Sequence, residues 1–515
     1  MATARKRRLR ERARRLEAVA PRRFPGFIRV MLLASAMMLV PALIGASERD
    51  WLVARVFLIH GVFFAFLSVI LGLAVMNRVP RIAERYHLVT LFLVYALLPL
   101  VLATPVNAIV PGVSIGAAYF EMLSCLTTTG ATLFDRAPEL LPAPLHLWRA
   151  MTGWAGGFMA LVVVFAILAP MNLGGFEFAE AAGVGNRSAT IDEAARRLVR
   201  FSTEIGPIYA GLTGLLAMAL LIAGDPPLVA VSHAMGTLST SGVSPIGGVQ
   251  DAPSGRLGEI LVAILFLPAI SHRITNYHLR HRRWPTFDDP QFRLMLISVL
   301  GVTLVLYLRA FAGAAEIDRE HDLAGTLRAL WGGFFTSVSF LTTTGYVSAD
   351  WRASQLWSNL PQPGTILMGL AVMGGGIATT AGGVKLFRLY VLYRHGLREM
   401  DLLTHPSSVL RRGRGERLIT PAGARIAFIF LMLFLIAIAV AMVGLAATGL
   451  GFEESLTFAI AALTTTGPLA GTLGEAGRYA ALPDSALAIL SLGMIVGRME
   501  TLVVVALLNP AFWRR

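Results

Sequence analysis

The chain has 515 residues, of which 55% are hydrophobic and 15% are charged, and its mean hydropathy is +0.66. Soluble proteins carry about 25% charged residues and divide into domains beyond about 300 residues, so this composition excludes a water-soluble protein and indicates many membrane spans. Lys and Arg number 45 against 31 Asp and Glu, and Cys125 is the only cysteine. A disulfide framework within the chain and a metal site built from several cysteines are therefore excluded.

The N-terminal tail holds most of the excess positive charge. Residues 1 to 23 contain ten basic side chains against Glu11 and Glu17, which supplies +8 of the net +14. A nucleic-acid-binding arm has a similar composition, but a basic run directly before a first apolar span is typical of a cytoplasmic N-terminus. We expect residues 1–26 to form a cytoplasmic tail that binds no nucleic acid and is not part of a cleaved signal peptide.

Long blocks of Leu, Val, Ile, Ala, Phe and Met predict helical spans, because membrane barrels have shorter strands of alternating hydropathy. Blocks of roughly 20 apolar residues are long enough to cross a bilayer. Ten of them lie at 27–46, 52–76, 88–105, 147–170, 205–223, 257–277, 294–313, 364–394, 424–449 and 484–508. The chain is therefore predicted to be an all-α polytopic membrane protein with ten membrane spans in contact with the lipid bilayer.

The charges of the connecting segments support this topology. With the N-terminus inside, the arginine-rich segments 77–87, 278–293 and 395–423 are cytoplasmic, whereas the acidic residues at 316–322 and 453–454 are external. This distribution agrees with the positive-inside rule, and only the nearly neutral loop 174–204 departs from it.

Four further apolar stretches are only about 12 residues long, which is the length of a re-entrant helix rather than a span. Each ends in Thr or Ser residues followed by a glycine. The sequences are FEMLSCLTTTGAT at 120–132, SHAMGTLSTSGVS at 232–244, FTSVSFLTTTGYV at 335–347 and TFAIAALTTTGPL at 457–469. Their glycines, Gly130, Gly242, Gly345 and Gly467, are 112, 103 and 122 residues apart. We predict four pseudo-repeats of span, pore helix, filter loop and span around one central pore, preceded by two extra N-terminal spans.

This repeat divides the chain into seven segments. They are the basic tail 1–26, two extra spans at 27–80, repeat 1 at 81–175, repeat 2 at 200–283, repeat 3 with a broken second span at 290–398, a cytoplasmic linker at 399–423 and repeat 4 at 424–515.

The Thr/Ser–Gly segments have the chemistry of a cation filter. A dehydrated alkali cation needs several oxygens, which backbone carbonyls and hydroxyls supply along a narrow path, and glycine permits the required backbone conformation. A pore helix that ends there also directs the negative end of its dipole at the ion. The predicted potassium-binding residues are Thr128, Thr129, Gly130, Ala131, Thr240, Ser241, Gly242, Val243, Thr343, Thr344, Gly345, Tyr346, Thr465, Thr466, Gly467 and Pro468.

At these residues the sequence resembles the Trk/Ktr/HKT superfamily of potassium transporters, and specifically the TrkH type. The matching segments are TTTGAT at 127–132, TTTGYVSADW at 342–351, Gly-Gly-Val-Lys at 382–385, and Gly497 to Glu500 with 509–514 after it. The resemblance implies potassium uptake across the bacterial inner membrane by a homodimer with one pore per subunit. It also implies control by a separate cytoplasmic nucleotide-binding ring of the TrkA type, since this chain has no G-x-G-x-x-G motif after a strand. No cofactor is expected in the chain, and K⁺ is the transported ion.

Two motifs depart from the family pattern. The fourth filter has Leu469 at a usual glycine position, and the segment before Lys385 reads GGGIATTAGG, with Ile377 and Ala378 in place of more polar or more flexible residues. These departures affect the expected gate kinetics and ion preference rather than the fold.

The stretch 364–394 is predicted to break within the membrane. Its 31 residues would form a helix of about 46 Å, against a hydrocarbon core of about 30 Å. We expect two half-helices joined by an irregular loop that lines the cavity beneath the filter. The candidate gate residues are Gly374, Gly375, Gly376, Thr379, Thr380, Gly382, Gly383, Lys385 and Arg498.

Two of these candidates are basic. Lys385 is one of only two lysines in the chain, and either lies near the ion path or extends from a half-helix to the cytoplasmic interface. Arg498 lies deep in an apolar run, where a charged residue is functional by default, so a pore-facing role is favoured over snorkelling or pairing with Glu500.

Two alternatives belong to other functional classes. A proton- or sodium-coupled secondary cation carrier of the same architecture would need a titratable acidic group in the middle of a span, and the sequence offers none. Glu121 and His233 stand nine residues before their filter glycines and either face the outer vestibule or pack the helix. An intramembrane enzyme is disfavoured because no H-E-x-x-H motif occurs, so we expect the protein not to be an enzyme.

Overall fold

A computed structural model describes residues 24–75, 83–134, 141–168, 191–270, 289–316, 323–351, 364–405 and 421–508. Within these ranges every regular element is a helix. Residues 1–23 of the basic tail, residues 174–190 of the predicted loop 174–204, and the closing segment 509–514 lie outside the described residues. Residues 191–204 are helical rather than a loop.

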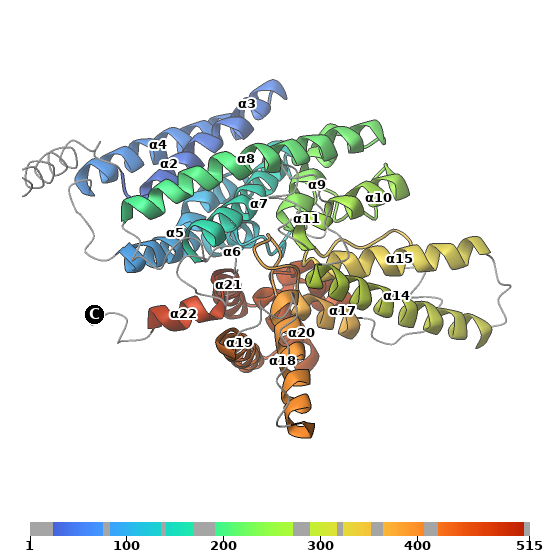
Figure 1. Cartoon of the computed structure of the whole chain (residues 1–515). Coiled ribbons are helices and arrows are strands. Elements are labelled where there is room, and N and C mark those ends of the chain that lie inside the picture. Colours follow the sequence, from blue (N-terminus) through green and yellow to red (C-terminus); the bar gives the residue numbers. More distant parts are fainter. Residues whose placement is uncertain are drawn as a thin grey trace, which may run out of the picture.

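Three helices precede the repeats in the described part of the chain. They are α2 (Gly26–Met37), α3 (Leu39–Ser47) and α4 (Trp51–Val75). The last of these packs antiparallel against the first two, and α3 also contacts the first repeat (Figure 1).

Each repeat contains a first span, a half-length helix and a second span. Repeat 1 comprises α5 (Ala83–Ile109), α6 (Ile115–Leu126) and α7 (Ala143–Val163), extended by the π-helix η2 (Val164–Leu168). Repeat 2 comprises α8 (Ile191–Ile222), α9 (Pro227–Ser239), α10 (Gly255–Leu265) and α11 (Leu267–Ile270). Repeat 3 comprises α14 (Pro290–Glu316), α15 (Leu323–Leu341), α17 (Gly364–Met373) and α18 (Leu386–Thr404). Repeat 4 comprises α19 (Pro421–Ala446), α20 (Phe452–Leu463), the 3₁₀ helices η5 (Gly467–Gly477) and η6 (Tyr479–Ala481), α21 (Asp484–Met499) and α22 (Thr501–Leu508).

Seven helices in the described part of the chain are long and apolar enough to cross a membrane. The other three predicted spans are interrupted, because α10 ends at Leu265, the glycine-rich loop separates α17 from α18, and α21 ends before Glu500, which has φ 64°. The all-helical, multi-span architecture follows from these elements, while the number of bilayer crossings stays a prediction.

Two helices are longer than their apolar stretches. The third half-length helix, α15, has 19 residues rather than about 12, and α8 begins at Ile191 instead of near 205. The added turns carry charged residues such as Arg328 and Arg200. A prediction of helix length that counts only apolar residues therefore makes these two helices too short.

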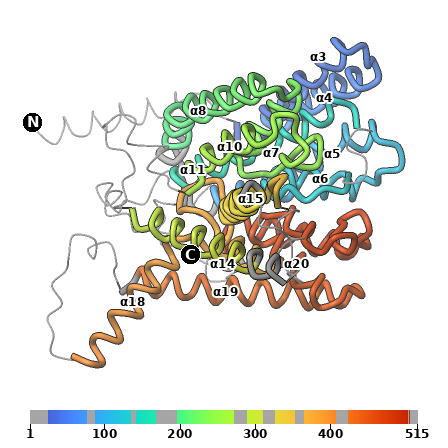
Figure 2. The backbone as a smooth tube through the Cα atoms, turned by 90° about the vertical axis from the view of Figure 1, so that its right-hand side faces the viewer, coloured from blue at the N-terminus to red at the C-terminus, as the bar shows by residue number. Residues whose placement is uncertain are grey.

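The four repeats close into a ring. The second span of each repeat packs against the half-length helix of the next repeat, in the pairs α7 with α9, α10 with α15, α17 with α20, and α21 with α6. Figure 1 shows the same order as a circuit of colours, in which the red α22 comes back beside the blue α5. In Figure 2, which looks at the molecule from the right-hand side of Figure 1, the yellow α15 lies in the middle of the view, with green helices above it and orange to red helices below it. The segments that end the half-length helices therefore meet in the middle.

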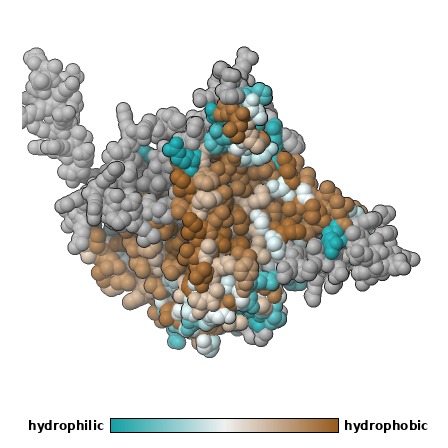
Figure 3. Space-filling view, turned by 90° about the horizontal axis from the view of Figure 1, so that it is seen from below, coloured by the Kyte–Doolittle hydropathy of each residue, from teal (hydrophilic) through white to brown (hydrophobic). Residues whose placement is uncertain are grey.

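The outer surface is that of a membrane protein. Exposed large hydrophobic side chains lie along α4, α8, α14 and α19, and include Phe66, Leu215, Ile297 and Val440. Figure 3 shows hydrophobic residues across most of the face that it draws, with hydrophilic residues mainly toward its margins. Such a surface is stable against lipid rather than against water.

Glycines let the second spans approach the half-length helices closely. A Cβ atom built at Gly156 of α7 would lie 2.9 Å from the carbonyl carbon of Leu126, the last residue of α6. A Cβ at Gly497 of α21 would likewise lie 2.8 Å from the carbonyl carbon of Leu463, the last residue of α20. Backbone cannot move aside as a flexible side chain can, so these two positions require glycine.

We predict that Gly156→Ala destabilises the protein by about 1–3 kcal/mol, because the added methyl overpacks the contact between α7 and α6. The matched control is Gly214→Ala in α8, where nothing lies within 4 Å of a built Cβ. Alanine is a better helix former than glycine, so the control should be at least as stable as the wild type. The check is thermal unfolding in detergent, and equal melting temperatures for the two variants would contradict the close packing.

Candidate functional site

The four Thr/Ser–Gly segments share one unusual backbone conformation. The Thr two residues before each glycine has a positive φ, which is 56° at Thr128, 53° at Thr240, 58° at Thr343 and 53° at Thr465. For a β-branched residue this conformation is an outlier that costs about 1–3 kcal/mol, and such strain is concentrated at functional sites. Its occurrence at the same place in all four repeats shows that each loop is held in this shape by its surroundings.

The same hydrogen bonds close the end of each half-length helix. The hydroxyls three residues and one residue before the glycine are joined in all four repeats, over 2.8 Å (Thr127, Thr129), 2.9 Å (Ser239, Ser241), 3.2 Å (Thr342, Thr344) and 3.1 Å (Thr464, Thr466). The N–H of the residue before each glycine donates to the carbonyl five residues earlier, over 2.8–3.0 Å. These bonds fix each helix C-terminus at its loop, so that four negative dipole ends converge there.

The loops contact one another in chain order. A Cβ atom built at each glycine would meet the next repeat: Ser241 O from Gly130, Thr344 O from Gly242, Pro468 from Gly345 and Ala131 N from Gly467. The last contact returns to the first repeat and completes the circuit. The structure thus brings all sixteen predicted filter residues together in one ring of four loops.

Oxygen atoms dominate the chemistry of this ring. The sixteen predicted filter residues include no charged side chain. The buried Oγ1 atoms of Thr128 and Thr465 have no hydrogen-bond partner among the described residues, and the Thr343 hydroxyl accepts from Gly382 N at 2.7 Å. The described part of the chain contains no cluster of three or more His, Cys, Asp or Glu side chains that could hold a metal. Uncharged carbonyl and hydroxyl oxygens near helix C-termini suit a monovalent cation that has lost its water.

The fourth loop differs from the other three. Gly467 lacks the positive φ of Gly130, Gly242 and Gly345, and instead begins the 3₁₀ helix η5. Its N–H donates to Thr129 O at 2.6 Å and its carbonyl accepts from the Tyr479 hydroxyl at 2.9 Å. Leu469, at the usual glycine position, is completely buried beneath this turn.

The position nine residues before each glycine fixes the outer part of its loop. Glu121 accepts from Leu133 N at 2.8 Å and from the Thr132 hydroxyl at 3.0 Å. His233 and Ser244 are bonded over 2.8 Å, and Thr336 accepts from Ser348 N at 3.4 Å. In the fourth repeat the equivalent Phe458 packs edge-on against Tyr479.

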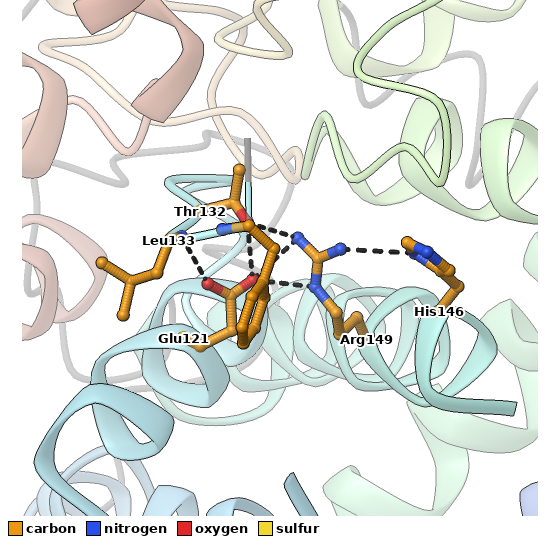
Figure 4. Close-up of polar contacts among 6 residues, drawn as sticks. Glu121, Thr132, Leu133, His146 and Arg149 are labelled. Carbon is orange, nitrogen blue, oxygen red and sulfur yellow. Dashed lines mark hydrogen bonds and ion pairs between the residues drawn. The ribbon is translucent and has the colours of Figure 1, made fainter. Parts of the chain in front are cut away.

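Glu121 is neutralised by a buried arginine. Arg149 of α7 donates its Nε to Glu121 at 2.8 Å and an Nη to the Thr132 hydroxyl at 2.8 Å, and another Nη lies 3.5 Å from His146 Nδ1 (Figure 4). The Glu121 side chain is 0% exposed and that of Arg149 is 4% exposed. Both Glu121 and His233 are therefore packing residues, and the alternative that they face an outer vestibule is wrong. Sequence reasoning missed Arg149, although an arginine inside the predicted span 147–170 was the available signal.

The glycine-rich loop 374–385 lies directly against the base of the ring. Gly382 bonds to Thr343, as described above, and a Cβ at Gly382 would also meet Thr464 O. The Thr380 hydroxyl donates to Leu238 O at 3.3 Å. The loop thus reaches the half-length helices or filter loops of repeats 2, 3 and 4.

The rest of the loop is anchored to repeats 2 and 3. Gly376 N donates to Ala269 O at 3.1 Å, and Ile377 N donates to the Gln291 side chain at 2.9 Å. The Thr379 hydroxyl donates to Gly376 O at 2.7 Å. Gly374 and Gly383 have φ values of 70° and 75°, and Gly375 approaches Ala381 too closely to carry a side chain. All the predicted gate residues of the loop therefore form one folded unit.

The two basic gate candidates bind this loop rather than an acidic partner. Lys385 is 8% exposed and donates to Ala381 O. Arg498 donates an Nη to Thr380 O at 2.6 Å, while its Nε and other Nη are buried without a partner among the described residues. Glu500 pairs with Arg388 instead, at 2.7 Å. Both candidates line a cavity that also borders Tyr95, Phe434 and Gly382.

An all-helical membrane protein with this ring of oxygen-rich loops has the features of a cation transporter. Comparison with known proteins gives the particular family. Residues 266–514 match the family model TrkH, described as a cation transport protein. The Trk system potassium uptake protein TrkI of Halomonas elongata is 32% identical, over 82% of this chain and 81% of that protein. The Trk system potassium uptake protein TrkH of Vibrio parahaemolyticus is 28% identical, over 94% of this chain and 97% of that protein.

A solved structure has the same fold. The crystal structure of the potassium transporter TrkH from Vibrio parahaemolyticus superposes with a TM-score of 0.76 at 25% identity, over 95% of this chain and 98% of that one. The chain belongs to the TrkH family of cation transport proteins.

We predict that Arg149→Leu lowers the free energy of unfolding by about 3–5 kcal/mol, because it leaves the Glu121 carboxylate buried without its cation. Arg200→Leu is the matched control, since Arg200 pairs with Glu204 but its side chain is 73% exposed. An exposed pair contributes about 0–1 kcal/mol, so the control should melt close to the wild type. Thermal unfolding of both purified variants gives the comparison, and a wild-type melting temperature for Arg149→Leu would show that the pair is not needed.

Proposed function

We propose that this chain is the pore-forming subunit of a Trk-type potassium uptake system of the bacterial inner membrane. The observation that carries the proposal is the closed ring of four Thr/Ser–Gly loops, each at the C-terminus of a half-length helix and each touching the next. In this proposal K⁺ sheds its water against the loop carbonyls and hydroxyls. The relatives named as potassium uptake proteins support potassium as the ion.

The proposal includes a topology and partners. Ten membrane crossings with the N-terminus in the cytoplasm agree with the charges of the connecting segments. The half-length helices then enter from the outside, and the glycine-rich loop lies on the cytoplasmic side of the ring. We further propose a homodimer with one pore in each subunit, regulated by a cytoplasmic nucleotide-binding ring of the TrkA type. The family membership supports these two assignments.

The glycine-rich loop and Arg498 form the proposed gate. The loop contacts the base of the ring at Gly382 and Thr380, which supports a position across the path below the filter. Arg498 binds Thr380 and carries a positive charge at the same level. A fixed cation in a medium of low dielectric constant raises the free energy of a passing K⁺ by several kcal/mol. Opening then requires the loop and Arg498 to move together.

A coupled carrier needs an acidic group free to exchange ions or protons along the path. The buried carboxylates of the described residues are already bonded. The pairs are Glu121 with Arg149, Asp225 with Ser254, Asp289 with Gln291 N, Asp350 with Arg256, and Glu259 with Trp331, Ser348 and Ala349. We therefore favour a gated pore. Potassium flux that is independent of a proton or sodium gradient would support the pore, and obligatory coupling to either gradient would reject it.

The filter assignment predicts that Gly345→Ser lowers the selectivity for potassium over sodium. Gly345 has φ 80° and a built Cβ would lie 2.8 Å from Pro468, so a side chain must distort the ring. Gly471→Ser is the control, because nothing lies within 4 Å of a Cβ there. The measurement is the ratio of potassium to sodium flux in proteoliposomes, and an unchanged ratio in the Gly345 variant would reject this loop as part of the filter.

The gate assignment predicts that Arg498→Ala, or deletion of part of the loop 374–383, increases potassium flux in the absence of any partner. Removing the fixed charge lowers the barrier for a cation. A purely structural Arg498 predicts lower flux together with a lower melting temperature, since Thr380 O would lose its donor. Rubidium uptake and thermal stability measured on the same preparation distinguish the two roles. Arg200→Ala serves as the exposed-arginine control.

A further inference from the structure

Glu259 is a buried carboxylate of repeat 2 that forms hydrogen bonds with residues of repeat 3. It lies on α10, the second span of repeat 2, and is 0% exposed. The donors that it binds among the described residues belong to repeat 3: Trp331 Nε1 at 2.7 Å, the Ser348 hydroxyl at 2.8 Å and Ala349 N at 2.7 Å. One side chain of repeat 2 thus contacts both α15 and the segment that follows the third filter loop.

Two of these donors stand three and four residues after Gly345. Ser348 is 1% exposed, and its hydroxyl also accepts from Asp350 N at 3.2 Å. Its carbonyl accepts from Trp351 N at 3.0 Å. Glu259 therefore holds a folded turn rather than a loose strand, and the position of this turn determines where the filter loop leaves the ring.

The turn is linked to two filter loops. Tyr346, two residues before Ser348, directly follows Gly345 and donates its hydroxyl to Val243 O at 3.1 Å. Val243 is the residue after Gly242 in repeat 2. Displacement of the turn would move Tyr346 and would release a filter carbonyl of the neighbouring repeat. The third loop thus depends on repeat 2 through Glu259, and the second loop depends on repeat 3 through Tyr346.

Repeat 1 meets the same need in another way. There, Glu121 of the half-length helix accepts a hydrogen bond from Leu133 N, three residues after Gly130, and Arg149 neutralises the charge of Glu121. Repeat 3 has the neutral Thr336 at the position of Glu121, and its hydroxyl accepts from Ser348 N over the longer distance of 3.4 Å, so Glu259 supplies the charged acceptor.

Three directed donors stabilise the charge of Glu259. Among the described residues no basic side chain bonds it, but Arg256, which pairs with Asp350 at 2.8 Å, lies near enough to interact with it electrostatically. Because water cannot replace a lost partner at a buried site, removing one of the three donors or one carboxylate oxygen leaves a polar group without a hydrogen bond, which costs free energy.

We propose that Glu259 is a positioning residue for ion selectivity, which sets the geometry of the third filter loop, and through Tyr346 that of the second, from the neighbouring repeat. The inference rests on the proposed function as a potassium pore. Glu259 touches no transported ion in this role. It acts by holding Ser348 and Ala349 in place.

The test is Glu259→Gln in the full-length protein, reconstituted into liposomes. The amide is nearly the same size, but its NH₂ group must face at least one of the three donors and leaves that donor without an acceptor. We expect the ratio of potassium to sodium flux to fall by about tenfold, which corresponds to the loss of one buried hydrogen bond. Glu204→Gln is the matched control, since this side chain on α8 is 53% exposed, and it should keep the wild-type ratio.

The flux ratio separates positioning from stability alone. A merely structural Glu259 would lower the melting temperature and the total flux but leave the ratio unchanged, and that result would overturn the inference while the proposed function stands. A wild-type protein without preference for potassium would overturn both. If Glu259→Gln cannot be purified, Ser348→Ala removes one donor to Glu259 together with the acceptor of Asp350 N, and it should also lower the ratio. A wild-type ratio in Ser348→Ala would then overturn the inference.

Discussion

Non-helical backbone inside a bilayer must find hydrogen-bond partners within the protein, because lipid offers none. This constraint governs the centre of the molecule. Four loops leave their helices at the same strained Thr conformation, and each is held by hydroxyl pairs, by the preceding helix and by the next loop. The glycine-rich loop of repeat 3 meets the same requirement by bonding to the base of the ring. In the proposed pore, the remaining carbonyl and hydroxyl oxygens of these loops face the ion.

The repeats keep one backbone plan but stabilise it with different side chains. Repeat 1 uses the Glu121–Arg149 pair, repeat 2 uses His233 with Ser244, and repeat 4 uses the Tyr479 hydroxyl. Repeat 3 takes its carboxylate from repeat 2. A single chain allows this variety, whereas a tetramer of identical subunits would have to use one solution four times. The ring is consequently fourfold in its backbone and asymmetric in its chemistry.

Much of this arrangement could be predicted from the sequence, because it depends on local patterns. The repeated Thr/Ser–Gly segments indicated the four loops, and the glycines between 374 and 383 predicted the break that separates α17 from α18. The break at Glu500 was not predicted, because Gly497, the nearest glycine, lies inside α21 and Glu500 itself is not a residue type that usually ends a helix. The partners of Glu259 lie 72 to 90 residues away in another repeat, and no local signal pairs them. Arg498 was predicted to be functional because it is a charged residue inside an apolar run. Its hydrogen bond to Thr380 could not be predicted, because that bond depends on how the loop folds back.

The closure of the ring between Gly467 and Thr129 has a consequence for how the protein is made. The first filter loop needs a neighbour from the last repeat to be synthesised, so during translation it lies in the membrane with one side of its backbone uncovered. Repeats 1 to 3 can insert and pack as they emerge, because the second span of each meets the half-length helix that follows it. The last quarter alone must contact both its predecessor and the first quarter. Completion of the ring is therefore a late, long-range step, of the kind that makes assembly slow and leaves partly folded intermediates exposed to misassembly.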